Sequence, residues 1–309
     1  DVAPSRGLGD VYKRQIMQHT ITADLDTNLR VIEESVENLM MGYVRPELIV
    51  GVEFGISKLP ITMEDGAIQF LSSLAKKHRV YLVPGTFAEK AEGLKDGEAY
   101  NTCPVFGPDG TLLCRYRKKV PFRPGEMSAP SNETEDYCIF EIQEKGITVG
   151  LQICYDQFFP EISRTLALKG AELILCPALD PIEYRHVPEI IPRARALENE
   201  LFYIWTCGTG QLGASTCCGN SIIADPEGQI VLQCPETPAL VTKTLDFSGV
   251  VLKREYGRDQ HLNSLRYFNV QYPFAGKIED APVYKNAGRL TANKKEYEEK
   301  THGIRMGDL

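Results

Sequence analysis

Cys154 stands where a predicted strand gives way to a predicted helix. Residues 147–153 form an apolar, β-branched run typical of a buried strand, and residues 161–169 have the spacing of an amphipathic helix. A side chain at such a bend is exposed, and nearby backbone N–H groups can face a developing oxyanion. The position therefore suits a nucleophile. Cysteine is also among the most buried residue types, and the chain has nine. Whether Cys154 is a nucleophile or a core residue therefore depends on which partner residues lie near it.

Two charged residues could serve as those partners. Glu53 ends the apolar strand 47–53, where an unpaired carboxylate is costly to bury, and Lys118 follows the strand 111–116. A thiol nucleophile needs a base and a nearby positive charge, which a glutamate and a lysine can supply without histidine. Ordinary roles stay open as well, because Glu53 could be an ion-paired rim residue and Lys118 lies in a basic run typical of a solvated face.

The elements that must position these side chains alternate along the chain. Helical spacing begins at Asp24, where Asp26 or Thr27 can cap the helix, and ends before Gly42. The remaining predicted helices cover 66–78, 161–169 and 189–200. The remaining predicted strands cover 80–84, 100–106, 137–142, 172–176, 201–207, 220–224, 229–232 and 240–245. This order predicts a mixed sheet with helices outside, in one domain from 16 to 274.

The two ends of the chain carry weaker patterns. Residues 1–15 show no periodicity, and 10–15 resemble a translated sequencing adapter, so we predict a non-native or disordered segment. The first strand would then survive only as 16–18. Residues 275–309 are polar and rich in lysine and glutamate, which predicts a tail.

Composition narrows the class of protein. Apolar residues make up 43% of the chain and the formal net charge is −8, with no basic patch, so we expect no nucleic-acid partner. No apolar run is long enough to span a membrane. The nine cysteines have irregular spacings and only five histidines accompany them, which argues against zinc. Cysteines within apolar strands indicate reduced core residues and a cytoplasmic protein.

Several segments together resemble the nitrilase superfamily of carbon–nitrogen hydrolases. In chain order these are Val52-Glu53-Phe54, Tyr116-Arg117-Lys118, Ile153-Cys154-Tyr155-Asp156 with Phe159-Pro160-Glu161, the helix 193–199, and the hairpin residues 219–221 and 225–228. Two features depart from the family: it more often has proline where Val52 stands, and the segment after Lys118 is shorter than in many members.

The resemblance implies a four-layer α-β-β-α sandwich and a Glu–Lys–Cys triad. Glu53 would be the general base, Lys118 the electrostatic stabiliser and Cys154 the nucleophile, with the Tyr155 backbone N–H helping Lys118 to hold the oxyanion. Glu126 is the nearest match to a second glutamate that the family often has after the lysine. No metal or cofactor is implied, and the helices 161–169 and 193–199 would pair across a two-fold axis in a homodimer or larger homo-oligomer.

The substrate is less closely defined. Residues 156–161 are similar to a motif of N-carbamoylputrescine amidases, with phenylalanine in place of tryptophan at one position. We expect the segment 180–186 to line the mouth of the site and to favour a polar or charged substrate; simple solvent exposure is the alternative. Its charged residues are Asp180, Glu183, Arg185 and His186.

We therefore predict a cysteine-dependent hydrolase of a small linear amide or N-carbamoyl amine, releasing ammonia or an amine through a thioester. Two alternatives remain: a nitrile hydrolase with the same triad, and a catalytically silent binding or assembly module of the same fold. The presence of all three triad residues favours an enzyme.

Overall fold

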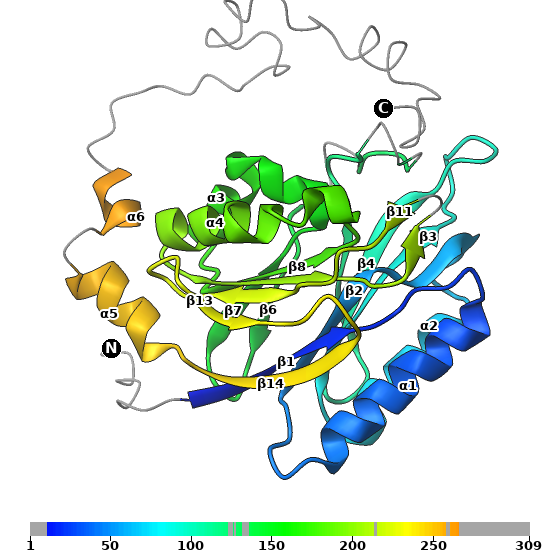
Figure 1. Ribbon diagram of the computed structural model, residues 1–309, viewed down its shortest axis with the longest axis horizontal. Helices are drawn as coiled ribbons and strands as arrows, with labels where there is room; N and C mark the ends of the chain where they lie inside the picture. Colours follow the sequence, from blue (N-terminus) through cyan, green and yellow to red (C-terminus); the bar gives the residue numbers. More distant parts are fainter. Residues whose placement is uncertain are drawn as a thin grey trace, which may run out of the picture.

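Two six-stranded sheets lie face to face between two layers of helices in the computed structural model (Figure 1). The structure describes residues 11–122, 126, 128–131, 136–212, 215–257 and 260–265. Helices α1 and α2 cover one outer face, and α3 and α4 cover the other. This is the four-layer α-β-β-α sandwich that the motifs implied, and the predicted fold class is confirmed.

The elements have the following bounds. The first sheet has the order β14-β1-β2-β3-β4-β5 and consists of β1 (Val11–Gln18), β2 (Leu48–Ile61), β3 (Tyr81–Glu89), β4 (Tyr100–Phe106), β5 (Leu112–Arg117) and β14 (Ala239–Asp246). The second has the order β13-β12-β9-β8-β7-β6 and consists of β6 (Ile139–Ile142), β7 (Ile147–Leu151), β8 (Leu173–Ala178), β9 (Phe202–Cys207), β12 (Ile222–Ala224) and β13 (Ile230–Gln233). The two-residue strands β10 (Gln211–Leu212) and β11 (Ser215–Thr216) form a separate pair.

The helices follow the strands in the chain. They are α1 (Leu25–Met41), α2 (Gly66–His78), α3 (Pro160–Leu168), α4 (Ile191–Asn199), α5 (Ser248–Tyr256) and α6 (His261–Ser264), with short 3-10 turns η1 (Cys154–Phe158), η2 (Ile182–Tyr184) and η3 (Val187–Glu189). Within the described ranges, no helix combines the length and the apolar character that crossing a membrane requires.

Each sheet has three parallel strands at its centre. In the first, β1, β2 and β3 run parallel, and in the second, β7, β8 and β9 do so, while the strands outside them pair antiparallel. Parallel neighbours need a crossover connection, and α1, α2, α3 and α4 lie in those connections. The crossovers place the helices on the outer faces and leave the inner faces to pack against each other.

Alternation along the strands builds the two interior layers. On β2, Leu48 and Val50 pack between the sheets, whereas Ile49 packs with the residues of α1 and α2. On β3, Tyr81 likewise packs between the sheets and Leu82 packs with the residues of α1 and α2. Successive side chains of a strand point to opposite faces, so a strand buried on both faces needs apolar residues at nearly every position.

The cap of α1 differs from the prediction. Asp24, and neither Asp26 nor Thr27, caps the helix, because its Oδ1 accepts a hydrogen bond from the Thr27 N–H at 2.8 Å. Asp24 has an extended backbone (φ −96°, ψ 118°), which lets its carboxylate reach back to the first turn. Asp26 and Thr27 already lie inside that turn.

Strand β1 is longer than the predicted remnant 16–18. It begins at Val11 and pairs with β14 over its whole length, from Val11↔Asp246 to Gln18↔Ala239, and it also pairs with β2 from Arg14. The predicted boundary at residue 16 therefore falls inside a strand, because β14 offers a backbone edge of equal length. Residues 1–10 and the predicted tail 275–309 lie outside the described residues.

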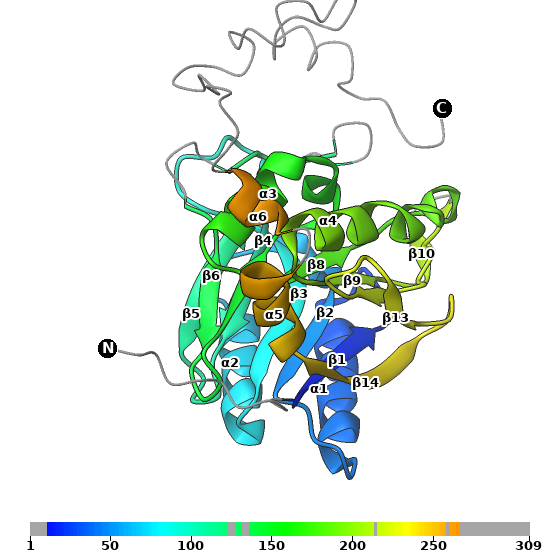
Figure 2. The same cartoon turned by 90° about the vertical axis from the view of Figure 1, so that its left-hand side faces the viewer.

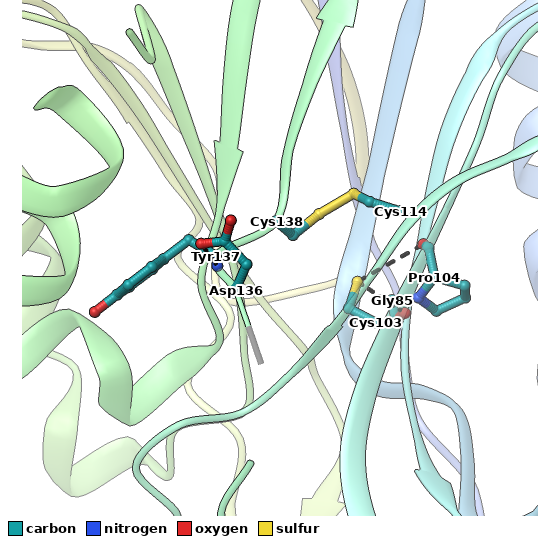
Figure 3. Close-up of a disulfide and its surroundings, with 7 residues drawn as sticks. All are labelled: Gly85, Cys103, Pro104, Cys114, Asp136, Tyr137 and Cys138. Carbon is teal, nitrogen blue, oxygen red and sulfur yellow. Dashed lines mark hydrogen bonds between the residues drawn. A yellow bond between two sulfur atoms is a disulfide. The ribbon is translucent and has the colours of Figure 1, made fainter. Parts of the chain in front are cut away.

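The prediction that the cysteines are reduced is wrong for two of them. Cys114 on β5 and Cys138 before β6 form a disulfide that joins the edge strands of the two sheets (Figure 3). These strands lie side by side at one edge of the sandwich (Figure 2), which brings together two cysteines separated by 24 residues. The other seven cysteines are free and buried.

Breaking the disulfide should lower the free energy of unfolding by about 3 kcal/mol, because it releases the loop between Cys114 and Cys138 in the unfolded chain. Denaturant unfolding with and without reductant measures this change. The Cys114→Ser/Cys138→Ser double variant is the control and should show the lower stability in both buffers. In denaturant without reductant, a thiol reagent should label seven cysteines; labelling of all nine in the chain would contradict the bond.

Candidate active site

The structure brings Glu53, Lys118 and Glu126 into direct contact in the interior. Glu53 lies on β2, and Lys118 follows the last residue of β5. The Lys118 Nζ lies 2.8 Å from Glu53 Oε1 and 2.5 Å from Glu126 Oε2, and all three side chains are buried. A buried ammonium is therefore shared by two carboxylates.

Asn101 on β4 completes this arrangement. Its Nδ2 donates to Glu53 Oε1 at 2.8 Å and to Glu126 Oε1 at 2.9 Å. The Phe122 N–H also donates to Glu126 Oε2, at 3.0 Å. Sequence reasoning missed Asn101, and the available signal was a polar residue in the apolar strand 100–106.

Cys154 lies at the sharp bend that the sequence predicted, after the end of β7, but its side chain is buried and not exposed as predicted. Its φ is 43°, a left-handed conformation that costs a non-glycine residue on the order of 1–3 kcal/mol. Neighbours on both sides hold the bend. The Gln152 side chain donates to Tyr203 Oη at 2.7 Å and accepts from Ser163 Oγ at 2.9 Å, and Arg195 on α4 donates to the Gln157 carbonyl at 2.8 Å.

Asp156 connects the segment that carries Cys154 to the segment that carries Lys118. Its Oδ2 accepts hydrogen bonds from Tyr116 Oη at 2.7 Å and from the Ile153 N–H at 3.1 Å, and its Oδ1 accepts one from the Val120 N–H at 2.9 Å. Tyr116 and Val120 flank Lys118, and Ile153 precedes Cys154. One fully buried carboxylate thus sets the position of two functional groups that belong to different sheets.

Charge and burial set the protonation of the Lys118 cluster. Burial alone would lower the pKa of Lys118, but Glu126 and Glu53 together raise it well above its ordinary value. Burial raises the pKa of Glu53 above its ordinary value, and repulsion from Glu126 adds to this against the pull of Lys118. The pKa of Glu126 is lowered, because Lys118 and the hydrogen bonds of this carboxylate outweigh its burial. Of the two carboxylates, Glu53 is the one suited to accept a proton.

The Cys154 thiol lies between two carboxylates. Its Sγ donates a hydrogen bond to Asp180 Oδ1 at 3.3 Å, and Glu53 lies close enough to act on it electrostatically. Burial, Asp180 and Glu53 together raise the pKa of Cys154 well above its ordinary value. The resting group is therefore a neutral thiol, which needs a base to remove its proton during attack.

The other predicted site residues are distributed differently. Tyr155 is half-buried in η1 and packs edge-on against Phe122, with ring centroids 5.1 Å apart. Of the segment 180–186, Asp180 is buried beside Cys154, whereas the side chains of Glu183, Arg185 and His186 are exposed. Their role in substrate binding remains a prediction.

Metal binding finds no support in the described part of the chain. No group of three or more histidine, cysteine, aspartate or glutamate side chains is gathered there as a metal site would require.

Comparisons with known proteins agree with this fold. The sequence profile described as carbon-nitrogen hydrolase matches residues 14–255. Nit3 of Saccharomyces cerevisiae, a member of branch 10 of the nitrilase superfamily, superposes with a TM-score of 0.71 at 26% identity, over 79% of this chain and 93% of that one. An amidase from Nesterenkonia sp. shares the fold, with a TM-score of 0.67 at 24% identity, over 82% of this chain and 95% of that one.

Curated relatives are similar over different lengths. A Pseudomonas protegens protein described as a hydrolase in the pqqF 5′ region is 38% identical over 49% of this chain and 52% of its own length, so the match spans about half of that relative. The 2-oxoglutaramate amidase of Paenarthrobacter nicotinovorans is 29% identical over 81% of this chain and 87% of its own. The omega-amidase of Mus musculus is 32% identical over 60% and 67%, respectively.

The two facing sheets and their helix layers have the architecture of nitrilase-superfamily enzymes. With the family profile covering most of its length, the chain belongs to the carbon–nitrogen hydrolase family.

Replacing Asp156 with asparagine should lower kcat by about 10- to 100-fold and change KM less. The amide offers one acceptor oxygen to three donors, so Lys118 and Cys154 lose their alignment, and a misplacement near 1 Å can cost about 100-fold. Steady-state kinetics on variants with a checked melting temperature measure the effect. Tyr116→Phe removes one donor and should have a smaller effect. A folded Asp156→Asn variant with the wild-type kcat would contradict the role.

Proposed function

We propose that the chain is a cysteine-dependent amidohydrolase of a small linear amide or N-carbamoyl amine. The observation that carries the proposal is the proximity of Glu53, Lys118 and Cys154 in the interior: Lys118 bonds Glu53, and both charged groups lie close enough to Cys154 to shift the pKa of its thiol. A base of raised pKa, a neutral thiol and a fixed ammonium are the three groups that acyl transfer to sulfur requires.

The geometry supports a two-stage reaction. Glu53 takes the proton of the Cys154 thiol while Sγ attacks the carbonyl carbon. The ammonium of Lys118 and the backbone N–H of Tyr155 stabilise the oxyanion of the tetrahedral intermediate. Glu53 then gives its proton to the leaving nitrogen, and ammonia or an amine departs from the thioester.

Hydrolysis of the thioester completes the cycle. Glu53, now ionised, takes a proton from a water molecule whose oxygen attacks the thioester carbon. The C–S bond breaks, and the proton held by Glu53 returns to the sulfur. The acyl product leaves as a carboxylic acid, or as a carbamate that loses carbon dioxide when the substrate is an N-carbamoyl amine. No cofactor takes part in these steps.

The relatives favour an amidase over a nitrile hydrolase. Two of them are named as an omega-amidase and a 2-oxoglutaramate amidase. We also propose that Glu126 positions Lys118 for the reaction. Asp180 would contact the bound substrate. Glu183, Arg185 and His186 would contact only a substrate long enough to reach the exposed end of their segment.

Cys154→Ala should abolish ammonia release from a panel of amides and N-carbamoyl compounds, to below about one thousandth of the wild-type rate, because no other group can form the thioester. A coupled ammonia assay on the purified variant measures this. Cys234→Ala is the control, since Cys234 is a free buried thiol outside the cluster, and its activity should persist. Activity in Cys154→Ala would refute the mechanism. Turnover of nitriles alone would favour the nitrile hydrolase, and no turnover by the wild type would favour a silent module.

We further propose a homodimer or larger assembly through the outer faces of α3 and α4. Leu168 and Leu197, on these helices, are 64% and 40% exposed, and Ile190 between them in the chain is 58% exposed. Sedimentation at micromolar concentration should show an assembly that Leu168→Glu/Leu197→Glu converts to a monomer. Met41→Glu, at the end of α1 on the opposite outer layer, is the control and should not do so. A wild-type monomer would contradict the proposal.

The seven free cysteines, the nucleophile among them, support a cytoplasmic location. A reducing compartment would keep Cys114 and Cys138 as two thiols until they meet an oxidant. Thiol labelling of the protein inside intact cells would show whether Cys114 and Cys138 are present there as a disulfide or as two thiols.

A further inference from the structure

Asp180 presents an unused hydrogen-bond acceptor beside the nucleophile. The residue lies two positions after the end of β8 and is only 8% exposed. Its Oδ1 faces the Cys154 Sγ at 3.3 Å. Its Oδ2 is buried and has no hydrogen-bond partner among the described residues. Burying a carboxylate oxygen without a donor costs free energy that a bound ligand can recover.

The backbone around Asp180 is firmly held. Its N–H donates to Cys207 Sγ at 3.3 Å, its carbonyl accepts from the Cys218 N–H at 2.8 Å, and Pro181 forms a bridge with Cys217. These contacts hold the backbone from which the carboxylate extends toward Cys154. Its position is a property of the folded chain, present before any substrate arrives.

Among the described residues, no lysine or arginine forms an ion pair with this carboxylate. Burial and repulsion from Glu53 raise the pKa of Asp180 to about 6, so the group is mostly ionised at neutral pH. Lys118 lowers this pKa from a distance, but its ammonium is bonded to both Glu53 and Glu126. The missing partner of Asp180 is therefore a donor that the substrate brings.

The position of Asp180 indicates which part of the substrate this donor occupies. In a reactive complex the carbonyl carbon lies about 3–3.5 Å from Sγ, so the atoms bonded to that carbon come within reach of Asp180. The carbonyl oxygen of the substrate points to Lys118. The leaving nitrogen of the substrate must contact Glu53, which returns the proton. The third substituent, on the acyl side, is left for Asp180.

We propose that Asp180 determines specificity by accepting a hydrogen bond from an N–H group on the acyl side of the scissile carbonyl, which selects N-carbamoyl amines over alkyl amides. In an alkyl amide this position is a methylene group and leaves Oδ2 unpaired, whereas in an N-carbamoyl amine it is an N–H. Sites built to bond a substrate N–H reject analogues that lack it. This inference rests on the proposed function and resolves its choice of substrate.

Three compounds of equal length test the proposal: N-propylurea, propyl carbamate and pentanamide, which place N–H, oxygen and methylene at the acyl-side position. Each is measured as a competitive inhibitor of turnover of the best substrate from the ammonia panel, so slow hydrolysis of the urea does not matter. The wild type should bind N-propylurea about 10- to 100-fold more tightly than the other two, the worth of one hydrogen bond to a charged acceptor.

The Asp180→Ala variant should reduce that preference to about one, whereas Glu189→Gln, an exposed carboxylate beyond η2, should retain it. If the alanine variant does not fold, Asp180→Asn replaces it and should still lower the preference, because a charge-assisted hydrogen bond is roughly twice as strong as a neutral one. Equal binding of the three compounds by the wild type, or an unchanged preference in the Asp180 variant, would overturn the inference and leave the proposed function standing. Failure of the wild type on the whole panel would instead refute the proposed function.

Discussion

The shared ammonium of Lys118 is the interaction on which the site depends. A single buried cation lies within 2.8 Å of Glu53 and 2.5 Å of Glu126, and Asn101 donates to the same two carboxylates. Removing Lys118 would leave two buried carboxylates without their cation, which is far more costly than losing a surface ion pair. The cluster therefore holds β2, β4 and the segment after β5 in one arrangement.

The Lys118 cluster lies on the first sheet, whereas the Cys154 thiol comes from the second sheet. Cys154 follows β7 in the second sheet, and the chain bends there because Cys154 itself has a left-handed backbone conformation. Asp156 connects this bend to Tyr116 and Val120 on either side of Lys118. The Asp156 carboxylate thus couples the position of the segment after β7 to that of the segment after β5. The geometry of the site therefore depends on how the two sheets pack.

Charge also separates the tasks of the carboxylates. Glu126 keeps a lowered pKa and remains the counter-ion of Lys118, whereas Glu53 has a raised pKa and can exchange a proton. Burial and repulsion from Glu53 raise the pKa of Asp180 to about 6, and no described cation is bonded to it. Three acids in one site thereby acquire three environments: a carboxylate paired with a cation, a carboxylate of raised pKa bonded to the same cation, and a carboxylate with an unpaired oxygen.

The sequence by itself determined the features that local patterns encode. Period-two and helical spacing predicted the strand 100–106, the helix 66–78 and the bend at Cys154, and the ordered motifs predicted the fold. The motifs also implied that Glu53, Lys118 and Cys154 meet, but only the tertiary structure showed that Asn101 bonds Glu53 and that Tyr116 bonds Asp156, which are 48 and 40 residues apart. The Cys114–Cys138 bond and the full length of β1 likewise depend on neighbouring strands distant in the chain. Long-range pairing follows from how the two sheets pack, and no local pattern contains it.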